Sequence, residues 1–148
     1  MNMTKNAIKD FETYFPELSK HVKEYKTNKF YELFAMLDNE FVVFYDYLEK
    51  SIRYIPKDSS NLEEQDYRYL LGIRLRNLLV CNSVNREYLS NTTGISETTI
   101  SRYINGTSTP SVYNMRKLAK SLNCTINDLK IDYYFDWKEN KKCFHYFQ

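Results

Sequence analysis

The chain has 148 residues, of which 43% are apolar and 27% are charged. This length suits one globular unit or two very small ones, and it excludes a large multidomain enzyme. Only three glycines and three prolines are present, too few for the turns of a β-sandwich or barrel, and neither a GxGxxG nor a GxxxxGK[ST] phosphate loop occurs. Composition therefore predicts a mostly all-α protein.

The formal net charge of +2 hides an uneven distribution along the chain. Residues 1–68 carry a net charge of −3, residues 69–130 carry +5, and residues 131–148 carry none. All three glycines lie between positions 72 and 106. The basic segment therefore differs from the rest of the chain, which indicates a separate domain.

The chain does not begin with a secretory signal, and no apolar run approaches the ~20 residues that a spanning helix needs. These features predict a cytoplasmic protein with reduced cysteines. His21 and His145 are far apart in sequence, and Cys143 with His145 offers two metal ligands at most. We therefore expect no catalytic residue, no metal site and no cofactor.

Residues 1–57 are predicted to form a helical module that serves dimerisation or partner binding. Apolar residues at spacings of three and four predict helices over about 5–14 and 16–26. Thr4 is the expected N-cap of the first helix, and Pro16 is tolerated at the start of the second.

A longer apolar stripe predicts a further helix over residues 29–55, which Pro56 ends. Its members are Phe30, Phe34, Leu37, Phe41, Phe44, Leu48 and Ile55. Residues 41–45 taken alone fit a strand, but the helical spacing continues on both sides and favours a helix. Because the apolar face is wider than a narrow seam, we expect part of it to meet a second copy or another protein.

Residues 58–68 are expected to connect this module to the basic segment. Ser60 and Glu63 have the spacing of a capping box, so a helix is predicted from there to about Cys81.

Two short helices are predicted within residues 82–106. Asn85 caps the first, which ends before Gly94, and Ser96 caps the second, which ends at Gly106. A helix, a short glycine turn and a second helix form the helix-turn-helix arrangement, in which the second helix enters the major groove of DNA.

Seven blocks of sequence, in order and in unbroken register over residues 69–130, resemble the XRE family of helix-turn-helix domains, the Cro and phage-repressor type. The blocks are Leu71–Leu78, Leu89–Ser90 with Gly94–Ser96, Thr99–Arg102, Asn105–Gly106, Pro110–Ser111, Leu118–Leu122 and Thr125–Leu129. The resemblance implies a five-helix, lambda-repressor-like DNA-binding domain.

The resemblance also implies which residues contact DNA. Arg86 falls where the family usually has a phosphate-contacting residue, while Arg102 and Thr98 are expected to meet base edges. The whole predicted DNA-binding set is Arg86, Ser96, Glu97, Thr98, Thr99, Ser101, Arg102, Asn105, Thr107 and Ser108. The alternative interpretation of the Ser and Thr residues is an ordinary solvated helix face.

Two departures from the family pattern bear on this domain. Similar domains often pair an Arg with a Glu at the positions that Leu79 and Ile104 occupy here, and well-packed apolar residues can replace a buried ion pair. Glu97 stands where Gln is common. Its carboxylate can accept a hydrogen bond from cytosine N4, but it repels phosphates.

Residues 131–148 form an aromatic tail, for which a short β-hairpin and a strand that pairs with another protomer are the two alternatives.

These patterns predict a sequence-specific transcriptional regulator, a dimeric repressor that reads double-stranded operator DNA in the major groove with residues 97–105. The alternative is a protein-binding inhibitor, an antitoxin-like or anti-defence factor of a mobile element, whose helix-turn-helix autoregulates its own promoter. In both cases the N-terminal module or the tail would supply protein contacts, and no membrane is involved.

Overall fold

The computed structural model describes residues 3–30 and 32–135, which divide into two compact units. The sheet unit comprises the described residues up to Leu62 together with residues 132–135, and the helical unit is Glu63–Ile131. Within the described ranges, no helix has the length and apolar content that crossing a bilayer requires.

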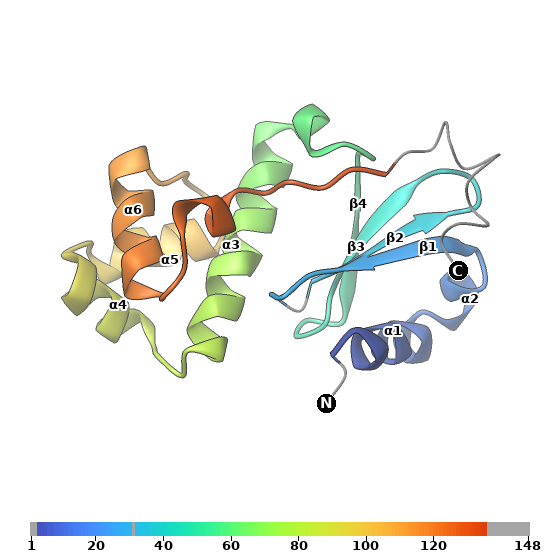
Figure 1. Ribbon diagram of the computed structural model, residues 1–148, viewed down its shortest axis with the longest axis horizontal. Coiled ribbons are helices and arrows are strands. Elements are labelled where there is room, and N and C mark those ends of the chain that lie inside the picture. The colour runs from blue at the N-terminus through green and yellow to red at the C-terminus, as the bar shows by residue number, and fades with distance from the viewer. Residues whose placement is uncertain (1–2, 31, 136–148) are drawn as a thin grey trace. The chain divides into compact units, whose positions relative to one another are not determined.

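The sheet unit contains four antiparallel strands that lie side by side in chain order (Figure 1). Its elements are α1 (Met3–Tyr14), α2 (Pro16–Ser19), β1 (Val22–Thr27), β2 (Leu33–Leu37), β3 (Val42–Asp46), β4 (Ser51–Ile55) and a 3₁₀ helix, η1 (Ser59–Asn61).

Helix α1 covers one face of this sheet. Phe11 is fully buried against alternate residues of the two central strands, which are Leu33, Ala35, Val43 and Tyr45. The rings of Phe11 and Tyr45 meet edge to face, with centroids 5.3 Å apart. Asp10 of the same helix accepts hydrogen bonds from the Tyr45 hydroxyl at 2.6 Å and from Lys50 Nζ at 2.9 Å. These contacts fix α1 on the sheet.

Residues 132–135 cover part of the opposite face. The ring of Tyr133 lies 4.9 Å from that of Phe34 on β2, and its hydroxyl donates to the Pro56 carbonyl at 2.7 Å. Phe135 is fully buried, and its backbone N–H donates to the Lys57 carbonyl at 2.9 Å. The sheet unit is therefore built from two separate stretches of the chain.

The predicted mostly all-α fold is wrong, because a sheet replaces the predicted helices of the N-terminal module. The helix expected over residues 29–55 is three strands, and the helix expected over 16–26 ends at Ser19 before β1. Thr4 lies inside α1, so it is not an N-cap. Strands β2 and β3 are buried on both faces and show no apolar–polar alternation. Short apolar strands separated by turns can therefore place apolar residues at spacings of three and four, which resemble the pattern of a helix.

The turns of the sheet explain why composition was misleading. Glu40 and Lys50 adopt left-handed backbone conformations, with φ of 71° and 54°. The side chains of Asn39 and Asp46 each accept the backbone N–H two residues further on, at 3.1 Å. Side chains of this kind form tight turns without glycine or proline, so a low glycine count does not exclude a small antiparallel sheet.

Two further expectations concern the ends of the sheet unit. The capping box of Ser60 and Glu63 is wrong, because the Asp58 side chain caps η1 and α3 begins at Glu64. The C-terminal hairpin falls largely on residues 136–148, outside the described residues. Before that point, Tyr134 forms an isolated antiparallel bridge with Asp58.

The helical unit contains the five helices that the resemblance implies (Figure 1). They are α3 (Glu64–Cys81), α4 (Arg86–Thr93), α5 (Glu97–Ile104), α6 (Val112–Ser121) and a 3₁₀ helix, η2 (Ile126–Leu129). Their buried faces make the core, whose fully buried members include Leu71, Leu75, Leu89, Ile100, Leu118, Leu122 and Leu129.

Two residues of α3 set the positions of other helices in this unit. At Gly72, α3 and α5 approach so closely that a Cβ atom would lie 2.3 Å from the carbonyl oxygen of Ile104. Arg74 is buried and donates to the carbonyls of Asp128 and Lys130 at 3.1 and 2.7 Å. Gly72 therefore permits the packing of α5, and Arg74 holds the end of η2.

Candidate nucleic-acid interface

Helices α4 and α5 are fixed by caps at their starts and by a glycine between them. The side chain of Asn85 accepts the Tyr88 N–H at 2.8 Å, and Ser96 accepts the Thr99 N–H at 3.1 Å. Gly94 has a left-handed φ of 76°. The predicted caps and turn are confirmed, and they fix where α4 ends and where α5 begins.

Helix α5 has a buried and an exposed face. Ile100 and Tyr103 are buried, and α5 packs against α3 and α4. Thr98 and Arg102, four residues apart and so on one side of the helix, are exposed. Its C-terminal end continues into Gly106, whose φ is 75°. This helix therefore presents a short polar surface on a rigid support.

The predicted DNA-binding residues gather at the start of α4, along α5 and in the loop that follows. Exposed residues of the set are Arg86, Ser96, Glu97, Thr98, Arg102, Asn105 and Thr107, and half-buried ones are Thr99, Ser101 and Ser108. Ser96 and Thr99 are engaged in the helix cap, where their hydroxyls also hydrogen-bond at 2.9 Å. Thr107 donates to the Arg102 carbonyl at 3.2 Å. These three residues therefore act first in shaping the backbone.

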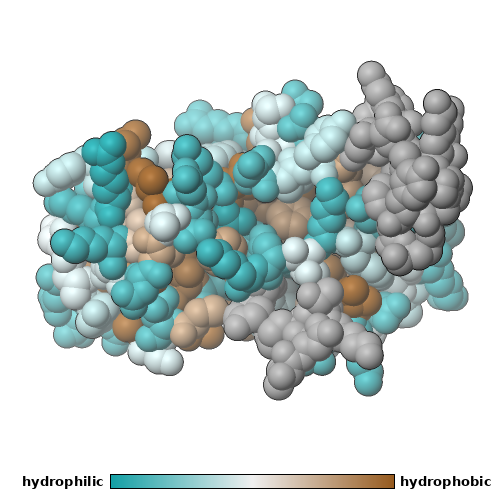
Figure 2. Space-filling view, viewed as in Figure 1, coloured by the Kyte–Doolittle hydropathy of each residue, from teal (hydrophilic) through white to brown (hydrophobic). Residues whose placement is uncertain are grey.

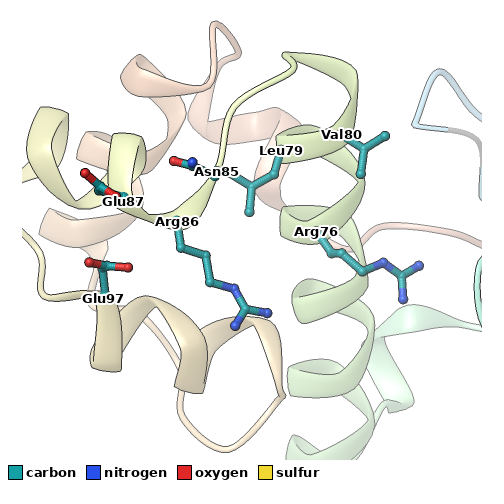
Figure 3. Close-up of a pocket in the computed structure, with 7 residues that line it drawn as sticks. All are labelled: Arg76, Leu79, Val80, Asn85, Arg86, Glu87 and Glu97. Carbon is teal, nitrogen blue, oxygen red and sulfur yellow. The ribbon is translucent and has the colours of Figure 1, made fainter.

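A shallow hollow opens beside α5 in the helical unit. It is lined by Arg76, Leu79, Val80, Asn85, Arg86, Glu87 and Glu97. Figure 3 shows the carboxylates of Glu87 and Glu97 on one side of this hollow and the guanidinium of Arg86 directed away from them. The Nη1 atom of Arg86 donates to Ser101 Oγ on α5 at 3.2 Å. The hollow thus brings side chains of opposite charge to the start of α4 and α5.

Sequence reasoning left two charged lining residues, Arg76 and Glu87, out of the DNA-binding set. Arg76 is half-buried on α3, one turn before Leu79 and Val80, and this spacing placed it on the same helix face. Glu87 follows Arg86 in the first turn of α4. Leu79 and Ile104, which stand at the positions of the family's ion pair, are both buried, as an apolar replacement requires.

The surface of the helical unit is mainly hydrophilic. Figure 2 shows this on the face turned to the viewer, over α4 and α6, with scattered hydrophobic residues. Residues 69–130 contain eight basic and three acidic side chains. A hydrophilic surface and an excess of basic over acidic residues in this unit suit a polyanion.

Residues 82–129 match the family model described as helix-turn-helix. The fold and this match identify the chain as a DNA-binding transcription regulator. The helical unit is a helix-turn-helix domain of the XRE type, which confirms the resemblance seen in the sequence.

Among curated proteins, none matches this chain. Among solved structures, the chain is similar to the restriction-modification controller protein C.AhdI from Aeromonas hydrophila, with 25% identity, coverage of 43% of this chain and 96% of that chain, and a TM-score of 0.42. It is also similar to the hypothetical transcription factor NHTF from Neisseria, with 24% identity, coverage of 54% and 87%, and a TM-score of 0.43.

Proposed function

We propose that this protein is a sequence-specific transcriptional repressor that binds a pseudo-palindromic operator as a dimer, with α5 in the major groove. The observation that carries the proposal is the exposed face of α5, from Glu97 to Asn105, between a capped start and a glycine turn. Side chains held at fixed spacing on a rigid helix are what recognition of base edges needs.

The exposed side chains differ in what each would read. Arg102 has the donors for a bidentate contact with guanine O6 and N7, and Thr98 suits a base edge or a thymine methyl group. Glu97 accepts hydrogen bonds and so favours cytosine N4. Asn105 and Thr107 are exposed in the loop after α5 and would contact the DNA backbone or adjacent bases.

Selection of bound sites from random double-stranded DNA with the full chain tests this proposal. We expect enrichment of two inverted half-sites whose centres lie about one helical turn, roughly 34 Å, apart. Sedimentation of the protein with the selected duplex should give two chains per site. Absence of any enriched sequence, or one chain on a single half-site, would contradict the proposal.

We propose that the dimer contacts lie in the sheet unit, which has its own core and is attached to the DNA-binding unit at both ends. Phe41 and Tyr54, 60% and 54% exposed with ring centroids 6.1 Å apart, are suitable positions for variants. Replacing both with Ser should lower operator affinity at low protein concentration and leave the enriched half-site sequence unchanged.

The second candidate is a protein-binding inhibitor or antitoxin-like factor that represses its own promoter. A sheet unit with a core of its own supports it, because such a unit can bind a partner of a different kind. A fragment spanning residues 63–131 discriminates between the two, since residues 132–135 pack with the sheet unit and belong with it. A monomeric fragment with weak operator binding favours the dimeric repressor, and a fragment that binds the operator as tightly as the full chain favours the inhibitor.

A further inference from the structure

The side chain of Arg86 crosses from one helix of the motif to the other. Arg86 is the first residue of α4, yet its Nη1 atom donates to Ser101 Oγ on α5 at 3.2 Å. Figure 3 shows the side chain extended into the hollow with its guanidinium turned away from Glu87 and Glu97. The resemblance implies a phosphate contact for Arg86, and within the protein its hydrogen-bond partner is Ser101 in the middle of α5.

The residue that holds Arg86 lies on the side of α5 that carries the reading residues. Ser101 is four residues after Glu97 and three after Thr98, which are neighbours of Ser101 on a helix surface. Arg102 follows it directly and is exposed. The guanidinium of Arg86, hydrogen-bonded to Ser101, therefore lies beside the face of α5 that would enter the groove.

The charge and the remaining donors of Arg86 are available to a ligand. Among the described residues no carboxylate pairs with Arg86, and its one hydrogen-bond acceptor is a neutral hydroxyl. A guanidinium has five N–H donors in a fixed fork, so a single bond to Ser101 leaves a pair for bidentate recognition. The bond to Ser101 also limits the rotation of a long side chain, which reduces the entropy lost when a base is bound.

We propose that Arg86 reads a guanine in the major groove, positioned by Ser101, and that base recognition is therefore shared between α4 and α5. This inference rests on the proposed function, because it requires α5 to enter the groove. Arg86 is bonded to Ser101 and Arg102 follows Ser101 on α5, so under this proposal each half-site contains two guanine contacts that come from different helices. The chemical class of ligand is a purine edge that offers two acceptors, guanine O6 and N7.

The test compares sequence preference and salt dependence for the full chain and its variants. With Arg86→Gln, selection from random DNA should lose the preference for guanine at one position of each half-site, and affinity for the parent operator should fall about tenfold to hundredfold. Binding to a duplex of unrelated sequence should change little. Lys120→Gln, which removes an exposed cation of α6 in the same unit, is the matched control and should keep every base preference.

Ser101 acts as a positioning residue, so its variants have their own readout. Ser101→Ala should weaken the preference at the same base position as Arg86→Gln, and Ser101→Thr, which keeps the hydroxyl, should restore it. The double variant of Arg86→Gln with Ser101→Ala should bind the operator no more weakly than Arg86→Gln alone, because both substitutions remove the same contact with guanine.

The contrary outcomes are distinct. If Arg86→Gln weakens binding to all sequences alike and lowers the salt slope by about one, Arg86 contacts a phosphate and this inference is overturned. If the parent chain enriches no sequence at all, the proposed function itself fails.

Discussion

Among the described residues, the left-handed positions of the helical unit are two glycines together with Ser83 and Asn123, whereas those of the sheet unit are both residues with side chains. Gly94 and Gly106 have φ of 76° and 75°, and Glu40 and Lys50 reach comparable angles in the turns between strands. The glycine turns can be recognised from residue type, whereas Glu40 and Lys50 carry no such signal. The turns at Glu40 and Lys50 are supported by the side chains of Asn39 and Asp46, which accept backbone N–H groups. Glycine content therefore reveals the turns made by glycine but not the turns made by residues with side chains.

The largest effect in this comparison is expected from Gly72→Ala. A Cβ atom would lie 2.3 Å from the Ile104 carbonyl oxygen and 2.9 Å from that of Tyr103, so the α5 backbone must move. We expect a loss of about 1–3 kcal/mol or more in the unfolding free energy of the helical unit, together with weaker DNA binding. Urea unfolding followed by amide hydrogen exchange measures each unit separately.

The control for Gly72→Ala is Val80→Ala, near the end of the same helix, where Val80 is 56% exposed. It should change the stability by less than about 0.5 kcal/mol. Equal effects of the two substitutions would show that the close approach of α3 to α5 does not limit stability.

A smaller effect is expected from exchanging the two kinds of turn residue. Nothing lies within 4 Å of a Cβ atom at Gly94, so Gly94→Ala should cost only the left-handed backbone, about 1–2 kcal/mol. Glu40→Gly relieves the same backbone cost but removes the ion pair with Lys57 at 3.1 Å. These opposed changes should leave a net effect under about 1 kcal/mol. A greater loss of unfolding free energy with Glu40→Gly than with Gly94→Ala would show that the strand turn depends more on its side chain than the helix turn depends on its glycine.

The smallest effect is a dependence on pH that belongs to the sheet unit. Burial acts to raise the pKa of Asp10, but hydrogen bonds from Tyr45 and Lys50 outweigh it, and the net pKa lies below its usual value of 3.8. The stabilisation is therefore complete above the unfolded pKa and is lost as pH falls through the lower folded pKa. Thermal unfolding from pH 6 to pH 2 should show a fall that Asp10→Asn reduces.

Glu49→Gln, which alters an exposed carboxylate of the same unit, is the control for the pH measurement. It should keep the acid dependence of the parent chain. A parent profile that is unchanged by Asp10→Asn would assign the acid sensitivity to other groups.

Sequence reasoning succeeded where short-range signals decide the structure. Asn85, Gly94 and Ser96 act within a few residues of themselves, and the structure has the predicted caps and turn. It failed over residues 29–55, because Phe34 packs against Phe44 of the paired strand and against Tyr133, about a hundred residues further along the chain. No local pattern records such a contact. The crossing of Arg86 to Ser101 was missed for the same reason, since it depends on the angle between two helices.

The return of residues 132–135 to the sheet unit has a consequence for how the protein is made. The helical unit is an insertion within the sheet unit, because Glu63–Ile131 interrupts it. Phe135 and Tyr133 leave the ribosome after the whole DNA-binding unit, so the sheet cannot bury Phe34 completely until that unit has been synthesised. The order of synthesis therefore favours folding of the helix-turn-helix first, and the sheet unit completes its core last.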